Sequence, residues 1–477
     1  NYFGITGKVL QVDGMLSEGK NGGALFENCT NVVLAFQVFA KQDRRQMEIL
    51  EKKFEKFEGE YNALLEAHVR LHRSLYKSAE FHIAEDEFEV CNEELKLKAY
   101  SGQVPLILLE KMWNYGRYLF ISGTSETSNP FSMYGLWGGR YDLVWSHNMA
   151  NINIQMIYWH CAKGGLASFI KCMISYYTNL MDDFRENAGQ MFGLKGIWVP
   201  AGTTPGYGLA NQIVPVIVNW ISAAGWLCSH FYEYYSYTKD EETLKKQILP
   251  FMLETLAFYQ DYLVVNKEGV YEIYPSVSPE NTPGNLQGKE LIHLAHANPA
   301  VKNATMDFAI LKEFLDNLIH LGKIAGIKEK EISEWQEMRK RIPKYQINSE
   351  NAVKEWMDET LEDFYYHRHF SHLYPIYPGN EIEEMEEEEK KQFYNALKLR
   401  VLGGQTSWSL IFMGALYARF KDGDNACSCL KHVCRTCLTN TFLTLHNDYR
   451  GMGMTVNLDE FAPVQLDELP DKWAVAL

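Results

Sequence analysis

Apolar residues recur at helical spacing along most of this chain, and this periodicity limits its possible folds more than any other feature. In one stripe the apolar positions that share a helical face are Leu166, Phe169, Ile170, Met173, Ile174, Tyr177, Leu180, Met181 and Phe184. Similar stripes occur near 211–237, 241–263, 305–325, 388–401, 406–420 and 424–438. Short turns such as TKDEE and KDGD separate neighbouring stripes. The pattern therefore predicts helical hairpins arranged as a closed toroid or a solenoid.

The two ends of the chain are predicted to differ from this helical region. ITGKVLQVDG and NVVLAFQVFA near the start are β-rich, and Asp13-Gly14 between them is a turn signal. The charged, amphipathic stretch that follows is typical of a linker helix or a helix pair. We therefore expect four parts, which are a partial N-terminal β-rich domain over 1–45, a helical linker over 46–100, a helical domain over 101–460 and the start of a C-terminal β-rich domain over 461–477.

Charge and hydropathy narrow the possible partners. The formal net charge is -15 over 477 residues, which disfavours binding of nucleic acid through the overall field and favours a neutral or weakly charged ligand. No apolar run approaches the roughly 18 residues of a membrane span, and the chain does not open with a signal peptide. NYFGITGKVLQVDG begins like the middle of a strand, so the natural start can be missing and a secreted or periplasmic location stays open.

The cysteines allow two readings. There are nine, an odd number, which disfavours a disulfide framework and favours a reducing interior such as the cytoplasm. Four of them lie in ACSCLKHVCRTCL as a potential zinc site, but the glycine or polar knuckle that a zinc pair needs is missing. We therefore favour small apolar fillers on a helix, and we predict no metal and no other cofactor. The sequence leaves the oligomeric state open.

The loops between the predicted helices have a composition of their own. They are rich in Gly, Pro, Asn, His and aromatic residues, and they cover 129–155, 199–212, 274–285, 367–380 and 446–467. Loops on a rigid scaffold commonly carry function. Their aromatic and polar residues suit a pocket for a polar ring with apolar faces, as sugars have.

Two asparagines precede an apolar, aromatic run in NINIQMIYW at 151–159. Side chains two residues apart share a face in an extended segment but diverge in a helix. If Asn151 and Asn153 act together, the segment must be extended or a turn, with a helix just after it. Their carbonyl oxygens could then accept both protons of one water, which a nearby carboxylate deprotonates as it attacks. Helix capping is the alternative, and it accounts for only one of the two asparagines.

Two carboxylates are candidates for proton transfer. Glu280 lies in the Pro-flanked segment SPEN, where apolar neighbours would raise its pKa, as a general acid requires. Judged on spacing alone, an exposed loop glutamate is the simpler reading. Asp467 ends the alternating apolar run PVQLD and could point inward, whereas Asp459 and Glu460 look like parts of a solvated turn.

HRHFSHL at 367–373 contains three histidines and an arginine. His367 and His369 stand two residues apart, but no acidic residue lies beside them at metal-ligand spacing. Imidazole both donates and accepts hydrogen bonds, so recognition of sugar hydroxyls fits as well. The plain alternative is one structural histidine and two surface ones.

Taken together, these segments resemble the family 95 glycoside hydrolases, the inverting α-L-fucosidases and their α-L-galactosidase relatives. The resemblance covers roughly residues 50–467. Its motifs occur in the family's order and are GRYLFIS at 116–122, MYGLWG at 133–138, NINIQMIYW at 151–159, AGWLCSHFYEYYSYTKD at 224–240, YPSVSPEN at 274–281, HRHFSHLYPIYPGN at 367–380, TSWSLIFMGALYARFKDGDNA at 406–426 and PVQLD at 463–467.

The resemblance implies a mainly α fold, an (α/α)6 barrel of six helical hairpins with a partial N-terminal β-sandwich-like domain and a short C-terminal β remnant. It implies an exo-acting glycoside hydrolase that releases a terminal α-linked L-sugar, L-fucose or L-galactose, from an oligosaccharide or glycan with inversion. Glu280 would be the general acid and Asp467 the base. Asn151 and Asn153 would hold the attacking water.

Candidate substrate-binding residues are Trp137, Met149, His367, His372 and Trp408. Relatives often have His or Thr at the position of Met149, where it helps to choose between fucose and L-galactose. Ile157 and the TTPG segment at 203–206 depart from the family pattern too, and both changes remove polar contacts. The departures leave the identity of the sugar open.

Two other functions stay open. A phosphorylase, or a glycosidase for another sugar, is one alternative; a phosphorylase would use phosphate in place of water, with His147 and Arg140 as candidate contacts. A non-catalytic glycan-binding relative is the other, since the three departures remove polar contacts. The family also continues beyond PVQLD with residues that this chain lacks, so we expect a segment of the natural protein to be missing between Asp467 and Glu468.

Overall fold

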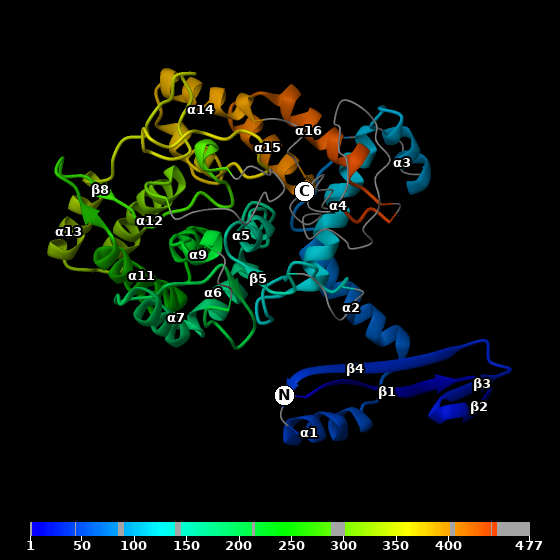
Figure 1. Cartoon of the computed structure of the whole chain (residues 1–477). Coiled ribbons are helices and arrows are strands. Elements are labelled where there is room, and N and C mark those ends of the chain that lie inside the picture. Colours follow the sequence, from blue (N-terminus) through cyan, green and yellow to red (C-terminus); the bar gives the residue numbers. More distant parts are fainter. Residues whose placement is uncertain are drawn as a thin grey trace. The chain divides into compact units, whose positions relative to one another are not determined.

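The computed structural model (Figure 1) describes residues 2–42, 44–83, 90–138, 145–211, 215–287, 301–400, 406–439 and 441–445. The chain forms two compact units, residues 1–77 and residues 78–477. The division between them falls within the linker predicted over 46–100. Within the described ranges, every helix is too short or too polar to cross a bilayer.

The first unit contains two antiparallel strand pairs. These are β1 (Tyr2–Val12) with β4 (Val32–Gln42), and β2 (Met15–Glu18) with β3 (Ala24–Glu27). The predicted turn lies between β1 and β2, where Asp13 Oδ1 accepts hydrogen bonds from the backbone N–H groups of Thr30 and Asn31, both at 2.9 Å. The β-rich start that the sequence predicted is therefore confirmed.

The charged stretch after β4 forms two helices, α1 (Arg44–Glu55) and α2 (Tyr61–Tyr76). The helix pair is thus the correct alternative. Lys8 Nζ on β1 donates to the carbonyl oxygens of Glu55 at 2.6 Å and Phe57 at 2.8 Å, which ties the end of α1 to the first strand.

The second unit is mainly helical, as the periodicity predicted. Its helices are α3 (Asn92–Tyr100), α4 (Leu106–Gly123), α5 (Asn153–Tyr158), α6 (Ile170–Thr178), α7 (Met181–Asn187), α8 (Pro215–Val218), α9 (Ala223–Thr238), α10 (Glu241–Thr243), α11 (Leu249–Tyr262), α12 (Thr305–Ile324), α13 (Glu329–Lys340), α14 (Glu387–Leu399), α15 (Ser407–Arg419) and α16 (Gly423–Thr436). Its strands are β5 (Asn148–Met149), paired with β6 (Gly202–Thr203), and β7 (Val264–Val265), paired with β8 (Tyr271–Glu272).

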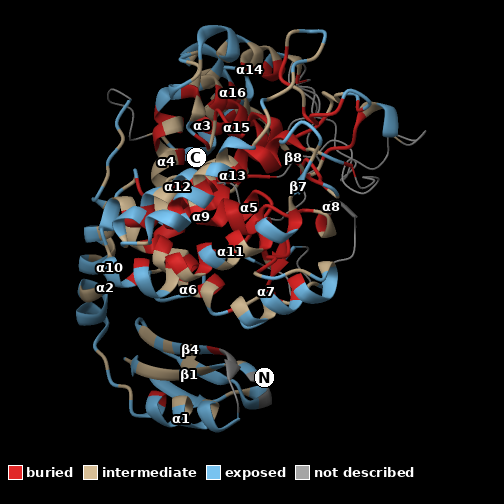
Figure 2. Cartoon of the chain, turned by 90° about the vertical axis from the view of Figure 1, so that its left-hand side faces the viewer, coloured by how far each residue is buried: buried red, intermediate tan, exposed pale blue. Residues whose placement is uncertain are grey.

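The core of the second unit lies around α9, whose sequence is apolar on most faces. This helix packs against α5, α6, α11 and α12, and buried residues gather on these helices in Figure 2. A Cβ added at Gly225 would lie 2.7 Å from Tyr259 Oη and 2.9 Å from Ile310 Cγ2. Because interiors are close-packed, glycine here allows α11 and α12 to approach α9.

The cysteine-rich segment is helical, as favoured from the sequence. Cys427, Cys429 and Cys434 lie on α16, and Cys437 follows its last residue. All nine cysteines are free thiols. Within the residues that the structure describes, no group of three His, Cys, Asp or Glu side chains is arranged to hold a metal ion.

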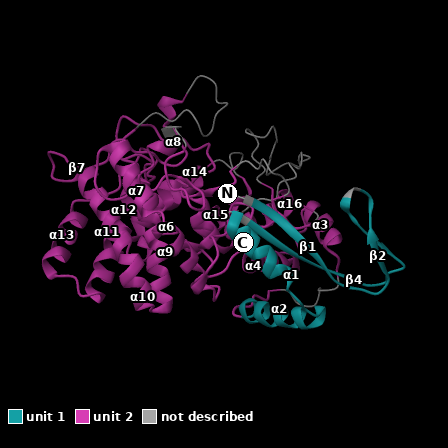
Figure 3. Ribbon diagram, turned by 90° about the horizontal axis from the view of Figure 1, so that it is seen from below, with its two compact units in different colours: residues 1–77 teal, residues 78–477 magenta. Residues whose placement is uncertain are grey.

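Apart from Asp467 and Arg140, the predicted site residues lie in segments of the second unit, shown in magenta in Figure 3. Asp467 and Arg140 lie outside the described residues, as does the predicted C-terminal β remnant. The roles and positions proposed for them stay predictions.

Candidate active site

A short strand pair holds the asparagine segment in place. β5 pairs with β6, and Ala150 N donates to Ala201 O at 2.6 Å directly after it. Trp220 Nε1 lies 3.4 Å from Ala150 O and donates to it. Asn151 then occupies a turn, as joint action of the asparagines requires, but Asn153 is already the first residue of α5.

The two asparagine amides have different partners. Asn151 is 1% exposed, and its Nδ2 donates to Glu280 Oε1 at 3.1 Å. Asn153 Nδ2 lies 3.1 Å from Met133 Sδ, in the MYGLWG segment. Asn151 Oδ1 is buried and accepts no hydrogen bond from any described residue. Since a buried amide oxygen needs a donor, this atom can accept one from a water or a ligand hydroxyl.

Glu280 is enclosed from two sides. Its side chain is 14% exposed, and Arg368 Nη2 donates to Oε2 at 2.6 Å. His369 Nε2 lies 3.5 Å from the same oxygen. One carboxylate oxygen therefore contacts Asn151 and the other contacts Arg368 and His369. The alternative of an exposed loop glutamate is wrong.

The expected direction of the Glu280 pKa shift is also wrong. Burial raises the pKa of Glu280, but the hydrogen bond from His369, the charge of Arg368 and the Asn151 contact outweigh burial and lower the pKa well below its usual value. Arg368 and His369 come from a segment distant in sequence, so no local pattern pairs them with Glu280. The site therefore stabilises an ionised carboxylate when no ligand is bound.

All three histidines of HRHFSHL are buried, so the alternative of two surface histidines is wrong. His367 Nδ1 accepts a hydrogen bond from His369 N at 3.0 Å. His372 Nδ1 accepts one from Arg400 Nη2 at 3.2 Å. Burial lowers the pKa of His369 to about 4, and burial lowers the pKa values of His367 and His372 as well. Near neutral pH these rings are uncharged and can both donate and accept.

The remaining predicted binding residues differ from one another in burial and in the groups they contact. Trp408 is 2% exposed and packs edge-on against the His369 ring, with centroids 4.7 Å apart. Trp137 is half-buried and stacks on Phe131. Met149 is 6% exposed and lies on β5. His147, the candidate phosphate contact, is half-buried just before that strand.

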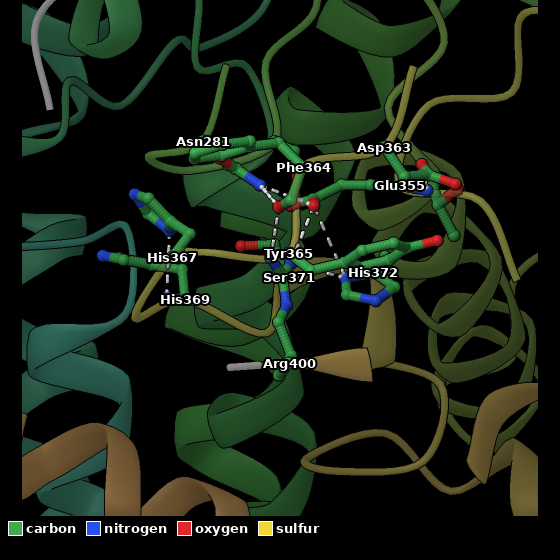
Figure 4. Close-up of polar contacts among 12 residues, drawn as sticks. Asn281, Glu355, Asp363, Phe364, Tyr365, His367, His369, Ser371, His372 and Arg400 are labelled. Atoms are coloured by element: carbon green, nitrogen blue, oxygen red, sulfur yellow. Dashed lines mark hydrogen bonds and ion pairs between the residues drawn. The ribbon is translucent and has the colours of Figure 1, made fainter. Parts of the chain in front are cut away.

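A second buried carboxylate, that of Glu355, was not predicted as a site residue and lies beside the Glu280 loop (Figure 4). Glu355 Oε2 accepts hydrogen bonds from Asn281 Nδ2 and Arg400 Nη2, both at 2.7 Å. Ser278 Oγ donates to Glu355 Oε1 at 2.8 Å. Ser278 and Asn281 belong to the motif that carries Glu280, and the predicted residue His372 contacts Arg400. These were the sequence signals that could have pointed to the network.

These contacts bring five separate segments of the predicted motif set together. They link 133–138, 151–159, 274–281, 367–380 and 406–426. The resulting arrangement combines a carboxylate with a low pKa, a buried amide acceptor and neutral imidazoles. Such groups can bind hydroxyls and, once the carboxylate is protonated, transfer a proton.

The fold belongs to a known class of helical barrels. A solved structure described as a putative kojibiose phosphorylase from human microbiome matches with a TM-score of 0.60 at 12% sequence identity. The match covers 90% of this chain and 60% of that chain. The second unit is thus of the (α/α)6 barrel type, and at this identity the likeness concerns the fold alone.

Sequence comparison then gives the family. The model of the glycosyl hydrolase family 95 catalytic domain matches residues 60–468, so the chain belongs to glycosyl hydrolase family 95. Alpha-L-fucosidase 2 of Arabidopsis thaliana is 27% identical over 388 residues, which cover 78% of this chain and 44% of that protein. A probable alpha-fucosidase A of Aspergillus niger is 23% identical over 403 residues, 81% of this chain and 49% of that protein. The chain spans about half the length of these relatives.

Proposed function

We propose that the protein is an exo-acting glycoside hydrolase that releases a terminal α-linked L-sugar from an oligosaccharide or glycan with inversion. Membership of family 95 and the fucosidase names of its relatives support the proposal. The observation that carries it is the 3.1 Å contact between Asn151 Nδ2 and Glu280 Oε1. This contact joins an amide and a carboxyl group from two motifs that are distant in sequence.

In the proposed reaction, Glu280 gives its proton to the glycosidic oxygen as the bond from that oxygen to the anomeric carbon breaks. A water attacks the anomeric carbon from the opposite face, held by the carbonyl oxygens of Asn151 and Asn153. Asp467 takes the proton that this water loses. An inverting enzyme holds its two carboxyl groups about 6.5–9.5 Å apart, which leaves room for the water.

The ion pair between Glu280 and Arg368 opposes the acid role, because it favours the ionised form. A sugar bound against Glu280 would separate its carboxyl from Asn151 and Arg368 and would exclude water. Both changes raise the pKa of a carboxyl group. The proposal therefore includes a weakening of these contacts when substrate binds. The pH dependence of Arg368 variants, described below, tests whether Arg368 sets the pKa of Glu280 in the free enzyme.

L-Fucose and L-galactose are both candidate sugars. Met149 has a thioether that cannot donate a hydrogen bond to a sugar hydroxyl, so the position that helps to select the sugar in relatives offers no such hydrogen bond here. Both sugars therefore belong in the assay.

The test compares Glu280→Gln and Asp467→Asn with the wild type on fucosyl and L-galactosyl oligosaccharides. We expect each variant to lose about 10²- to 10⁴-fold in kcat, the usual contribution of general acid–base catalysis. NMR of the first product formed should show the inverted anomer. Glu254→Gln is the matched control, since Glu254 is also paired with an arginine, Arg185, at 2.9 Å, and it should retain wild-type turnover.

Three outcomes would contradict the proposal. Wild-type-like turnover by Glu280→Gln would remove the acid role. Turnover that depends on inorganic phosphate would indicate a phosphorylase. Sugar binding by calorimetry without turnover across a glycan panel would indicate a glycan-binding protein.

A further inference from the structure

A buried carboxylate that the proposed mechanism does not use holds both sides of the loop that carries Glu280. Glu355 is 2% exposed. Ser278 Oγ donates to its Oε1 at 2.8 Å, and Asn281 Nδ2 donates to its Oε2 at 2.7 Å. Ser278 and Asn281 flank the Pro279-Glu280 pair, so one side chain restrains the backbone on either side of the acid.

Arg400 completes this network. Its Nη2 donates to Glu355 Oε2 at 2.7 Å, and its Nη1 donates to Phe364 O at 2.7 Å. Asn281 Nδ2 also donates to Phe364 O, at 2.9 Å, so Asn281 and Arg400 share the same two acceptors (Figure 4). Two charges are expensive to bury unless they are paired and hydrogen-bonded, and here both conditions are met.

The backbone of Glu355 is fixed as well. Its N–H donates to Asp363 Oδ1 at 2.8 Å, and its carbonyl oxygen accepts from Thr305 N, at the start of α12, at 3.0 Å. The carboxylate therefore has a defined position relative to a core helix. The Glu280 loop is anchored to that helix through Glu355.

The HRHFSHL segment at 367–373 also contacts the loop that carries Glu280. Ser371 Oγ donates to Pro279 O, while Arg368 contacts the Glu280 carboxylate itself. Three consecutive residues are thus each held by a hydrogen bond: Ser278 and Glu280 through their side chains, and Pro279 through its carbonyl oxygen. The backbone of the loop is therefore held in place, and a shift of Glu280 relative to Asn151 when substrate binds must come from its side chain.

We infer that Glu355 is a positioning residue, which acts through Ser278 and Asn281 to hold the Glu280 carboxyl between Asn151 and Arg368. The inference rests on the proposed function, in which that carboxyl is the general acid. Glu355 does not contact substrate, since its side chain is buried and both of its oxygens accept hydrogen bonds from the protein.

A general loss of stability is the competing explanation for any effect of a Glu355 variant. Asp307 provides a matched control, because it is also fully buried and accepts hydrogen bonds from two serines, Ser222 and Ser276, both at 2.6 Å. Those serines do not flank Glu280. Ser276 belongs to the motif that carries Glu280, but it does not bond to Glu355, so Asp307→Asn disturbs a similar buried carboxylate beside the same loop while the Ser278 and Asn281 contacts with Glu355 stay in place.

The experiment measures kcat and KM of Glu355→Gln and Asp307→Asn on two α-L-fucosides. One is an oligosaccharide, whose leaving oxygen needs a proton, and the other is α-L-fucosyl fluoride, whose leaving group needs far less acid assistance. We expect Glu355→Gln to lose about 10²-fold in kcat on the oligosaccharide, as for a misplaced catalytic group, with a much smaller loss on the fluoride and little change in KM. Asp307→Asn should change both substrates equally.

An equal loss by Glu355→Gln on both substrates, or no loss on either, would overturn the inference. If that variant does not fold, Ser278→Ala removes only one of the donors to Glu355, and it should show the same dependence on the leaving group with a smaller loss. Equal effects of Ser278→Ala on the two substrates would likewise overturn the inference.

A structural measurement separates this inference from the proposed function. If the wild type hydrolyses neither substrate, the proposed function fails, and a crystal structure of Glu355→Gln still tests the positioning. We expect the 3.1 Å contact between Asn151 Nδ2 and Glu280 Oε1 to be lost in that variant. An unchanged contact would overturn the positioning role.

Discussion

The pKa values of two buried carboxyl groups, Asp307 and Glu280, are shifted in opposite directions. Burial raises the pKa of Asp307 to about 7, although hydrogen bonds from Ser222 and Ser276 reduce this effect. At Glu280 burial acts in the same direction, but His369, Arg368 and Asn151 outweigh it. Asp307 has only neutral donors, so the presence of a cation in contact accounts for much of the difference.

At the residue scale, the charge of Arg368 should set the upper pH limit of activity. Arg368 lowers the pKa of Glu280, and a general acid is active only while it is protonated. Arg368→Met removes the charge and so raises this pKa. We expect the alkaline limb of the kcat/KM profile against pH to move to higher pH.

Arg368→Lys is the matched variant for this prediction, since it keeps the charge but loses the planar guanidinium. Its alkaline limb should stay close to that of the wild type. If the limb of Arg368→Met coincides with the wild-type limb, the charge of Arg368 does not control the acid.

At the scale of elements, the short loop after α7 packs closely against α11. Gly196 lies between α7 and the core Trp198, with φ of +74°. A Cβ at this position would lie 2.2 Å from Glu254 O and 2.5 Å from Phe258 N, both on α11. Only glycine fits between this loop and the helix, because a methyl group would overlap backbone atoms that cannot rotate away.

Gly196→Ala should therefore lower the free energy of unfolding by about 3 kcal/mol. This loss combines the cost of steric overlap with the cost of a left-handed backbone at a residue other than glycine. Gly193→Ala is the control. Gly193 has a similar φ of +70°, but no atom lies within 4 Å of an added Cβ, so we expect a loss of about 1 kcal/mol. Urea denaturation of both variants measures the difference, and equal losses would contradict the steric argument.

At the scale of the whole molecule, Asp307 should make stability depend on pH. Its folded-state pKa of about 7 exceeds the ordinary value of 3.8, so the folded state binds more protons between these values. The contribution of Asp307 is fully present below about pH 4 and is lost as pH rises to about 7. The difference between these two pKa values corresponds to about 4 kcal/mol in the free energy of unfolding.

Thermal unfolding of the wild type and Asp307→Asn at several pH values checks this prediction. Relative to the variant, the wild type should become less stable from pH 4 to pH 7. Asp240→Asn gives the opposite sign, but below about pH 4: hydrogen bonds from Thr243 lower the pKa of Asp240 below its ordinary value, so its contribution is lost as pH falls rather than as pH rises. A pH-independent difference between the wild type and Asp307→Asn would contradict the prediction.

Much of the fold could be predicted because helix periodicity is a local property of the sequence. The stripes near 305–325, 406–420 and 424–438 correspond to α12, α15 and α16. The stripe at 166–184 is divided between α6 and α7. Apolar spacing continues across such a break, so the pattern alone cannot place it.

The candidate site was predicted only in part. Asn151 and Glu280 were selected from their motifs, and the structure brings them into contact. Arg368 was noted among the histidines of HRHFSHL but was given no role, and Glu355 lies in a segment, VKEWMDE, without any distinguishing pattern. Both act through contacts that are distant in sequence, which spacing cannot reveal.

The sequence by itself determined the helical class, the β-rich start and the motifs that place this chain in family 95. Only the tertiary structure decided which charges surround Glu280, and with them the direction of its pKa shift. The reason is physical. Helix periodicity depends on neighbours along the chain, whereas the protonation of a buried carboxyl depends on groups such as Arg368 that folding brings within hydrogen-bonding distance.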